Sequence, residues 1–293
     1  MALTADVLSG AESSTDTVRV QHRQREFDFK AVRPDDHIFR ILRKTHRFYE
    51  NDVLNRLLER LSRVGGSRGA AIDAGAFMGT HSVFFGGVIG LGPIVSFEAN
   101  PDTFSVLVRN LTENGLADRS IPINCAVGAR EGQVSLEFGR PENLGTTRVS
   151  QSSIGSVSVR MVSIDKELDR RGIDKVSLIK IDVEGAELDV LDGAAGTLDA
   201  CRPLLCIEVH TAAQLREVLR RVAPLGYRII DCLGRSPTYI LECNGQHRWT
   251  GTLANRLWLW RAALPSGSRA TKRFLRRLGQ VMTTGWWDSP PDG

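Results

Sequence analysis

The sequence predicts an α/β fold with a doubly wound, mainly parallel sheet. Short apolar runs alternate with amphipathic helical patterns from Ala70 to Cys243, which is typical of this fold class. The first apolar run turns into a helix through two glycines, Gly75 and Gly79, as a buried strand does at a ligand-binding edge. The last two apolar runs, 227–230 and 239–243, predict an antiparallel pair at the C-terminal edge.

Composition is that of an ordinary globular protein. A chain of 293 residues with 42% apolar and 25% charged residues can form one large domain with extensions. The net charge of +4 is too small to predict a nucleic-acid partner. The five cysteines are scattered and form no C-x-x-C pair, which indicates reduced thiols and a cytoplasmic protein. We see no signal peptide and no apolar run long enough to cross a membrane.

Three regions differ in pattern. Residues 1–64 predict an N-terminal arm and helical cap, with a loose arm over 1–20, a short strand over 27–30 and a strong helical pattern from Tyr49. Residues 65–245 predict the α/β domain. Residues 246–293 form a basic extension that holds all five tryptophans.

Within the α/β domain, each apolar run is followed by a capping or helical signal. We expect strands over 70–73, 94–98, 121–127, 133–138, 157–162, 176–183, 204–209, 227–230 and 239–243. We expect helices over 81–87 and 100–114, from Gly185 to about Leu198, and around 215–222. The run 133–138 is expected to pair antiparallel with 157–162.

The glycine turn differs from the fingerprint that binds dinucleotides. In the G-x-G-x-x-G pattern a second glycine contacts the pyrophosphate, and Phe77 stands at that position. A ligand without a pyrophosphate does not need that glycine, and S-adenosylmethionine is such a ligand. The helix N-terminus can bind its carboxylate, and Asp73 can lie near its cationic end. The alternative is a tight turn that binds nothing.

A second acid follows at a spacing that suits an adenosine site. Glu98 ends the second strand of the domain, near the offset at which an acid accepts hydrogen bonds from ribose hydroxyls in Rossmann-like folds. The alternative is a solvated acid at a strand end. The complete set of predicted donor-binding residues is Asp73, Gly75, Phe77, Gly79, Glu98, Ala99, Asn124, Cys125, Ala126 and Asp182.

Four further polar residues follow two later strands. The two-residue period of a strand places Lys180 and Asp182 on one face, and Glu208 and His210 are also two residues apart. A lysine within a central strand is costly unless it is paired. We therefore expect a linked cluster of these side chains at the strand ends. A purely structural ion network is the alternative.

These motifs together resemble the FkbM-type S-adenosylmethionine-dependent methyltransferases. The resemblance rests on the turn 73–79, on Phe97-Glu98-Ala99-Asn100-Pro101, on the block 180–187 and on Glu208-Val209-His210, and it covers about residues 48–243. It implies the Rossmann-like sheet of the class I methyltransferases. It also implies methyl transfer to a hydroxyl of a sugar or secondary metabolite.

For this reaction we predict His210 as the base, because histidine titrates near neutral pH, with Glu208 orienting it. Asp182 is the second candidate for the base, or a partner for the donor's amino group. Lys180 would keep the acids ionised and stabilise a developing alkoxide. Alternatively, Mg²⁺ bound by Asp182, Glu208 and His210, with Glu184, would lower the pKa of the acceptor hydroxyl.

Other functions fit the sequence less well. An NAD-dependent oxidoreductase would need the missing glycine, and a non-catalytic ligand-binding protein would not need the whole set of polar residues. RNA methylation is disfavoured because few aromatic residues lie outside 246–293. The basic helical pattern 269–281 is compatible with a membrane surface, but a helix packed on the domain, a lid or an oligomer contact is favoured. The expected partner is a small-molecule hydroxyl acceptor.

Overall fold

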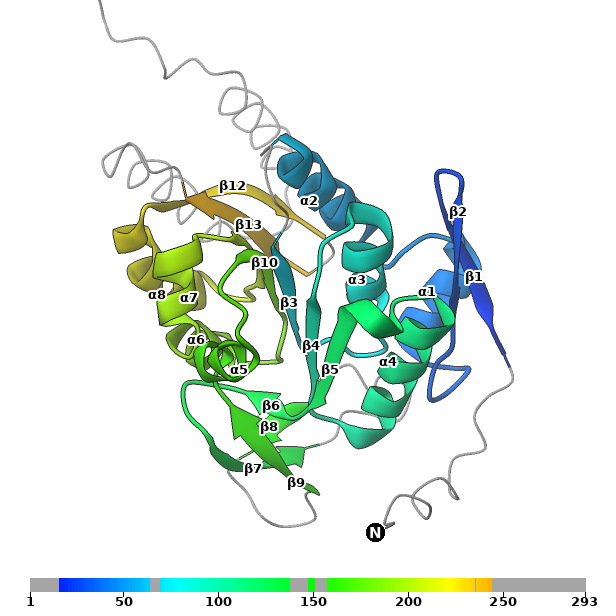
Figure 1. The fold of residues 1–293 in the computed structure, drawn as a ribbon, viewed down its shortest axis with the longest axis horizontal. Coiled ribbons are helices and arrows are strands. Elements are labelled where there is room, and N and C mark those ends of the chain that lie inside the picture. The colour runs from blue at the N-terminus through cyan, green and yellow to red at the C-terminus, as the bar shows by residue number, and fades with distance from the viewer. Residues whose placement is uncertain (1–15, 64–68, 138–146, 151–156, 235, 244–293) are drawn as a thin grey trace, which may run out of the picture.

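The computed structural model describes residues 16–63, 69–137, 147–150, 157–234 and 236–243. At its centre is a seven-stranded sheet with the strand order β12-β13-β11-β10-β3-β4-β5 (Figure 1). The strands are β3 (Ala70–Ala74), β4 (Ile94–Glu98), β5 (Ser120–Asn124), β10 (Val176–Ile181), β11 (Leu204–Glu208), β12 (Tyr227–Leu233) and β13 (Thr238–Cys243). Strands β3, β4, β5, β10 and β11 run parallel to one another. Strand β13 is antiparallel to both of its neighbours, β11 and β12. The predicted doubly wound, mainly parallel fold is therefore confirmed.

Helices cover both faces of the sheet, and Figure 1 shows the two layers on opposite sides of it. One layer holds α1 (His37–Thr45), α2 (Asn51–Arg63), α3 (Thr80–Val83), a π-helical turn (Phe84–Ile89) and α4 (Pro101–Glu113). The other holds α5 (Ile164–Arg171), α6 (Glu187–Asp192), α7 (Ala195–Cys201) and α8 (Ala212–Val222). Strand residues alternate between the layers, so Ile179 and Ile181 face α5–α8 while Leu178 faces α1–α4.

A small second sheet follows the carboxyl end of β5. The run predicted as one strand over 121–127 divides at Cys125, and β6 (Ala126–Val127) leaves the main sheet to pair with β9 (Val157–Val162). The predicted antiparallel pair is confirmed in β7 (Gly132–Glu137) and β9, and β8 (Arg148–Ser150) lies beside β7. The Cys125 N–H still donates to the Glu98 carbonyl (3.1 Å), and beyond it Ala126 pairs with Met161 of β9 instead of with β4.

The helix predicted from Gly185 to Leu198 is two helices, α6 and α7, which meet at Gly193. A Cβ on Gly193 would lie 2.1 Å from the Gly128 carbonyl oxygen. The chain must therefore bend where it passes the backbone that leads into β7. Periodicity alone did not show this close contact.

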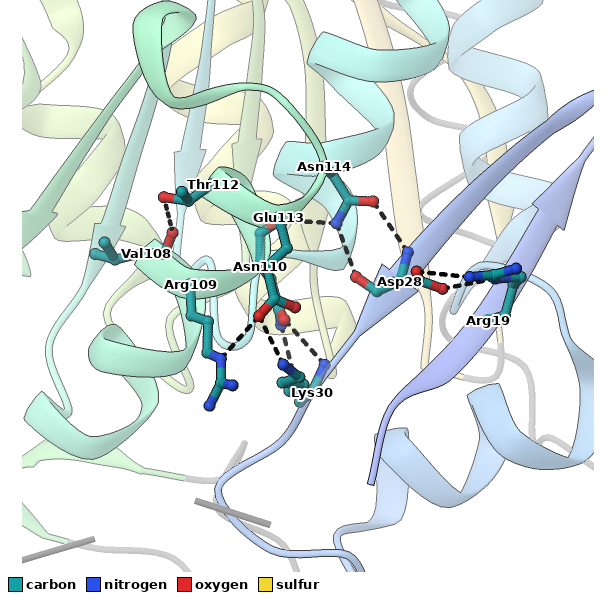
Figure 2. A network of polar contacts seen from close by, with 9 residues as sticks. All are labelled: Arg19, Asp28, Lys30, Val108, Arg109, Asn110, Thr112, Glu113 and Asn114. Carbon is teal, nitrogen blue, oxygen red and sulfur yellow. Dashed lines mark hydrogen bonds and ion pairs between the residues drawn. The ribbon is translucent and has the colours of Figure 1, made fainter. Parts of the chain in front are cut away.

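The arm predicted as loose over residues 1–20 ends in a strand, since residues 18–20 belong to β1 (Val18–His22). This strand pairs with β2 (Arg25–Phe29), the strand predicted over 27–30. Figure 2 shows how this hairpin is attached to α4. The Asn114 side-chain amide accepts a hydrogen bond from the Asp28 N–H (3.0 Å) and donates one to the Asp28 carbonyl (2.8 Å). The Asn110 amide makes the same two hydrogen bonds with the Lys30 backbone (2.9 and 3.0 Å). The two amides thus satisfy the edge of the hairpin in place of a neighbouring strand.

Asn110 also connects the hairpin to the glycine turn. It is fully buried, and its amide donates a further hydrogen bond to the Met78 carbonyl (2.8 Å). The N-terminal region is therefore attached directly to the segment that follows β3.

Other predictions concern the rest of the chain. All five cysteines are free thiols, as expected. Within the described ranges, no helix has both the length and the apolar character needed to cross a bilayer. The extension 246–293, with its candidate helix 269–281, lies outside the described residues, and the three-region division remains a prediction.

Candidate active site

A cavity of about 380 Å³ opens at the carboxyl ends of the parallel strands, within the size range of small-molecule sites. Its walls come from the segments after β3, β4, β5, β10 and β11. They also come from the start of α1, the residues before α2 and the β12–β13 loop. The cavity therefore lies where ligands bind in open α/β sheets.

The glycine turn forms one wall of this cavity. Gly75 has a φ of +76°, and a Cβ there would lie 1.8 Å from the Asp182 carbonyl oxygen. Gly79 has a φ of +86°, and a Cβ there would lie 2.6 Å from Leu107. Both positions therefore require glycine. Gly79 itself does not line the cavity, whereas Gly75 and Phe77 do.

Glu98 lies at the next strand end and lines the cavity. Its two carboxylate oxygens accept the backbone N–H groups of Phe77 (2.8 Å) and Asn100 (2.9 Å). Burial raises the pKa of Glu98 to about 7 against the opposing effect of these two bonds. Each oxygen keeps a further lone pair, so Glu98 can accept hydrogen bonds from a ribose.

The segments after β4 and β5 complete this side of the cavity. Ala99, Cys125 and Ala126, which we predicted to contact the donor, line it. Asn124 does not. Its amide instead donates to the carbonyls of Glu98 (2.8 Å) and Ala99 (3.2 Å), so it holds the segment that follows β4.

Asp73 and Lys180 lie beneath the cavity rather than in its wall. Asp73 is fully buried, accepts the Ser82 hydroxyl (2.6 Å) and pairs with the Lys180 ammonium (3.4 Å). The same ammonium donates to the Gly75 carbonyl (2.7 Å) and pairs with Asp182 (3.4 Å). Asp73 is therefore not among the residues that line the cavity, and its place beside the cationic end of the donor stays a prediction. Lys180 instead joins the glycine turn to the next strand.

The pKa values of this group follow from its charges. Burial by itself would lower the pKa of Lys180, but the carboxylates of Asp182, Asp73 and Glu50 raise it above its ordinary value. The ammonium in turn holds the pKa of Asp182 below its usual range against the effect of burial. Lys180 is therefore charged and Asp182 ionised at neutral pH.

Asp182, Glu208 and His210 continue the chain of contacts along the strand ends. Burial raises the pKa of Glu208 to about 8, and repulsion from Asp182 and a hydrogen bond to it add to the shift. At neutral pH the pair thus holds one proton, which Glu208 donates to Asp182. The Nε2 atom of His210 lies 3.4 Å from the second Glu208 oxygen. The predicted cluster of four residues is therefore present as a contiguous set.

His210 stands at the end of this set of contacts, with its Nε2 atom toward Glu208. The His210 backbone is fixed by a hydrogen bond from its N–H to the Gln214 side chain (3.0 Å). The side chain itself is 46% exposed and lines the cavity. His210 can therefore accept a proton from a molecule bound there.

Three acids form the one candidate metal group that the described residues contain. One carboxylate oxygen from each of Asp182, Glu184 and Glu208 lies within 4.8 Å of the others. His210, predicted as a further ligand, is not part of this group. Burial and repulsion from Asp182 raise the pKa of Glu184.

Several lining residues were not predicted. His37, Tyr49, Glu50 and Ser236 come from the N-terminal cap and the β12–β13 loop. Glu50, Phe77 and Glu184 have φ values of 50°, 50° and 54°, a left-handed conformation that is rare outside glycine. Such strain is retained mainly at functional sites. The sequence offered one signal, the Tyr49-Glu50 pair before a strong helical pattern.

Comparisons with known proteins agree with this geometry. A family model described as the Methyltransferase FkbM domain matches residues 73–229. The hexuronic acid methyltransferase AglP of Haloferax volcanii is 30% identical over 58% of this chain, and the methyltransferase sdnD of Sordaria araneosa is 27% identical over 42%. The chain spans 66% and 59% of the lengths of these relatives.

Solved structures give weaker similarities. The crystal structure of a methyltransferase FkbM from Methylobacillus flagellatus has a TM-score of 0.46 at 20% identity, covering 62% of this chain and 45% of that one. A precorrin-6y C5,15-methyltransferase from Geobacter metallireducens has a TM-score of 0.40 at 15% identity, covering 65% and 86%.

Proposed function

The chain belongs to the FkbM methyltransferase family, and from this premise we propose that it transfers a methyl group from S-adenosylmethionine to a hydroxyl of a sugar or secondary metabolite. The name of one relative, a hexuronic acid methyltransferase, supports a sugar acceptor, and the name of the other supports methyl transfer. One observation carries the proposal. A single cavity joins the glycine turn and Glu98 on one side to Asp182, Glu208 and His210 on the other.

The described residues fit the donor. Gly75 lets the turn after β3 pack directly against the Asp182 backbone at the cavity wall, and Glu98 can accept the ribose hydroxyls. Ala99, Cys125 and Ala126 would contact the adenine, and the ionised Asp182 would pair with the donor's amino group. When bound, the donor supplies a methyl group activated by a sulfonium, whose departure leaves a neutral thioether.

On the acceptor side, His210 performs the proton transfer. Its imidazole would accept the proton of the acceptor hydroxyl as the hydroxyl oxygen becomes methylated, and Glu208 would stabilise the imidazolium that forms. Lys180 keeps Asp182 ionised so that Glu208 retains its proton-sharing partner. The rest of the catalytic effect comes from alignment within a largely buried cavity.

The proposal is tested by binding and by product analysis. Calorimetry is expected to show that the protein binds S-adenosylhomocysteine and does not bind NAD, because Phe77 replaces the glycine that a pyrophosphate requires. With a labelled methyl donor, the label is expected in the small-molecule fraction of a cell extract. Binding of NAD alone, or label found only in RNA, would contradict the proposal.

Removing divalent metal is expected to leave methyl transfer intact. Lys180 already compensates the charge of Asp182, and the proton shared with Glu208 compensates the second carboxylate. Initial rates measured with and without a chelator are therefore expected to agree. A loss of rate that added Mg²⁺ restores would assign Asp182, Glu184 and Glu208 as metal ligands instead.

A further inference from the structure

The half of the cavity opposite the donor residues lies over β10, β11 and β13. This half is on the other side of β3 from β4, which provides Glu98, and from β5, which leads into Ala126. Glu50, Glu184, Glu208 and His210 line it. If the proposed methyl transfer is correct, this is where the acceptor binds.

Glu50 is held in this half by three separate elements. Its carboxylate lies 3.4 Å from the Nε2 atom of buried His81, at the start of α3, and 3.4 Å from the Thr238 hydroxyl of β13. A Cβ on Gly234, after β12, would lie 3.0 Å from the same carboxylate. Glu50 itself adopts the left-handed conformation that residues other than glycine avoid. A strained carboxylate fixed at a cavity wall is a candidate for ligand recognition.

The described side chains that line this half of the cavity include several acids and no basic residue other than histidine. Glu50, Glu184 and Glu208 contribute carboxyl groups, and no lysine or arginine occurs among the lining residues that the structure describes. Of the described acids that line the cavity, Lys180, which lies beneath it, pairs only with Asp182. Repulsion from Asp182 and Glu184 contributes to the raised pKa of Glu208. Another ionised acid in the cavity would meet the same repulsion, whereas hydroxyl groups would donate to these oxygens.

We propose that Glu50 determines acceptor specificity by binding hydroxyls beside the reacting one, so that the chain methylates uncharged polyhydroxylated rings and rejects rings that carry an ionised acid. The proposal rests on the proposed methyl transfer. It sets this chain apart from the relative named for hexuronic acid.

Three matched probes test the substrate class: a panel of neutral methyl hexopyranosides, the corresponding hexuronic acids and the corresponding uronamides. The uronamide has nearly the shape of the uronic acid without its charge. We expect kcat/KM for the neutral sugars and the uronamides to exceed that for the uronic acids by about 100-fold, because like charges are brought together only in the last case. Equal or better methylation of the uronic acids would overturn the proposal.

The variant Glu50→Gln tests the role of the residue. It is expected to reduce the preference for the uronamide over the uronic acid by about tenfold, because one like charge is removed. It should also raise KM for the neutral sugar more than it lowers kcat. Glu59→Gln is the matched control, since Glu59 lies on α2, pairs with Arg56 and Arg63 and does not line the cavity. If Glu50→Gln lowers the rates with all three probes equally and keeps the preference for the uronamide over the uronic acid, Glu50 does not determine specificity.

Two further results separate the possible failures. If Glu50→Gln does not fold, Glu184→Gln replaces it as the test. This variant must also reduce the preference for the uronamide over the uronic acid, and an unchanged preference would overturn the proposal. A protein that binds S-adenosylhomocysteine but methylates no neutral member of the panel would refute this inference alone. A protein that does not bind S-adenosylhomocysteine would refute the proposed function instead.

Discussion

The variant Lys180→Met is expected to lower the free energy of unfolding by about 3–5 kcal/mol, because it leaves buried carboxylates without their countercharge. Lys180 is 5% exposed, and its ammonium contacts Asp73, Asp182 and the Gly75 carbonyl. Methionine preserves the length of the side chain but none of these interactions. Urea denaturation followed by circular dichroism would measure the loss.

The matched control is Lys166→Met. Lys166 is 61% exposed and pairs with Glu131 at the surface, so its replacement should change stability by less than about 1 kcal/mol. The double variant Lys180→Met, Asp73→Asn should regain part of the loss, since it also removes one of the uncompensated charges. A stability of Lys180→Met close to that of the wild type would show that the three contacts contribute little.

The variant His210→Ala is expected to lower kcat by about 10²- to 10⁴-fold, which is the usual contribution of a positioned general base. Binding of S-adenosylhomocysteine should be unchanged, because His210 is not among the residues proposed to bind the donor. Steady-state kinetics and calorimetry on the same preparation would check both statements.

The control for this experiment is His46→Asn. His46 ends α1 in the left-handed conformation, which asparagine tolerates, and it does not line the cavity. Its variant should keep the wild-type kcat. If His210→Ala retains most of its rate while Asp182→Asn loses it, the base is Asp182, the second candidate. Equal losses of kcat and donor affinity would indicate a structural role for His210.

Much of this site followed from the sequence because parallel strands end at one edge of a sheet. Asp73, Glu98, Asp182 and Glu208 each stand at a strand end, and the two-residue period placed Lys180 with Asp182. The sequence did not show which of these strand-end residues reach the cavity and which lie buried beneath it. Asp73 and Glu98 have equivalent positions in the sequence pattern, yet only Glu98 reaches the cavity, because β3 continues to Ala74 and its register places Asp73 opposite Ser96, two residues before Glu98.

By itself the sequence determined the order of strands and helices, the glycine turn and the set of polar residues at the strand ends, since these depend on local periodicity and backbone conformation. Only the tertiary structure decided that the Tyr49-Glu50 segment and Ser236 share a cavity with His210. Contacts between such distant segments depend on how α1, α2 and the β12–β13 loop pack against the sheet, and no local pattern records that packing. The pKa of Glu208 was likewise decided by tertiary structure, because its value follows from burial and from a neighbouring carboxylate on another strand.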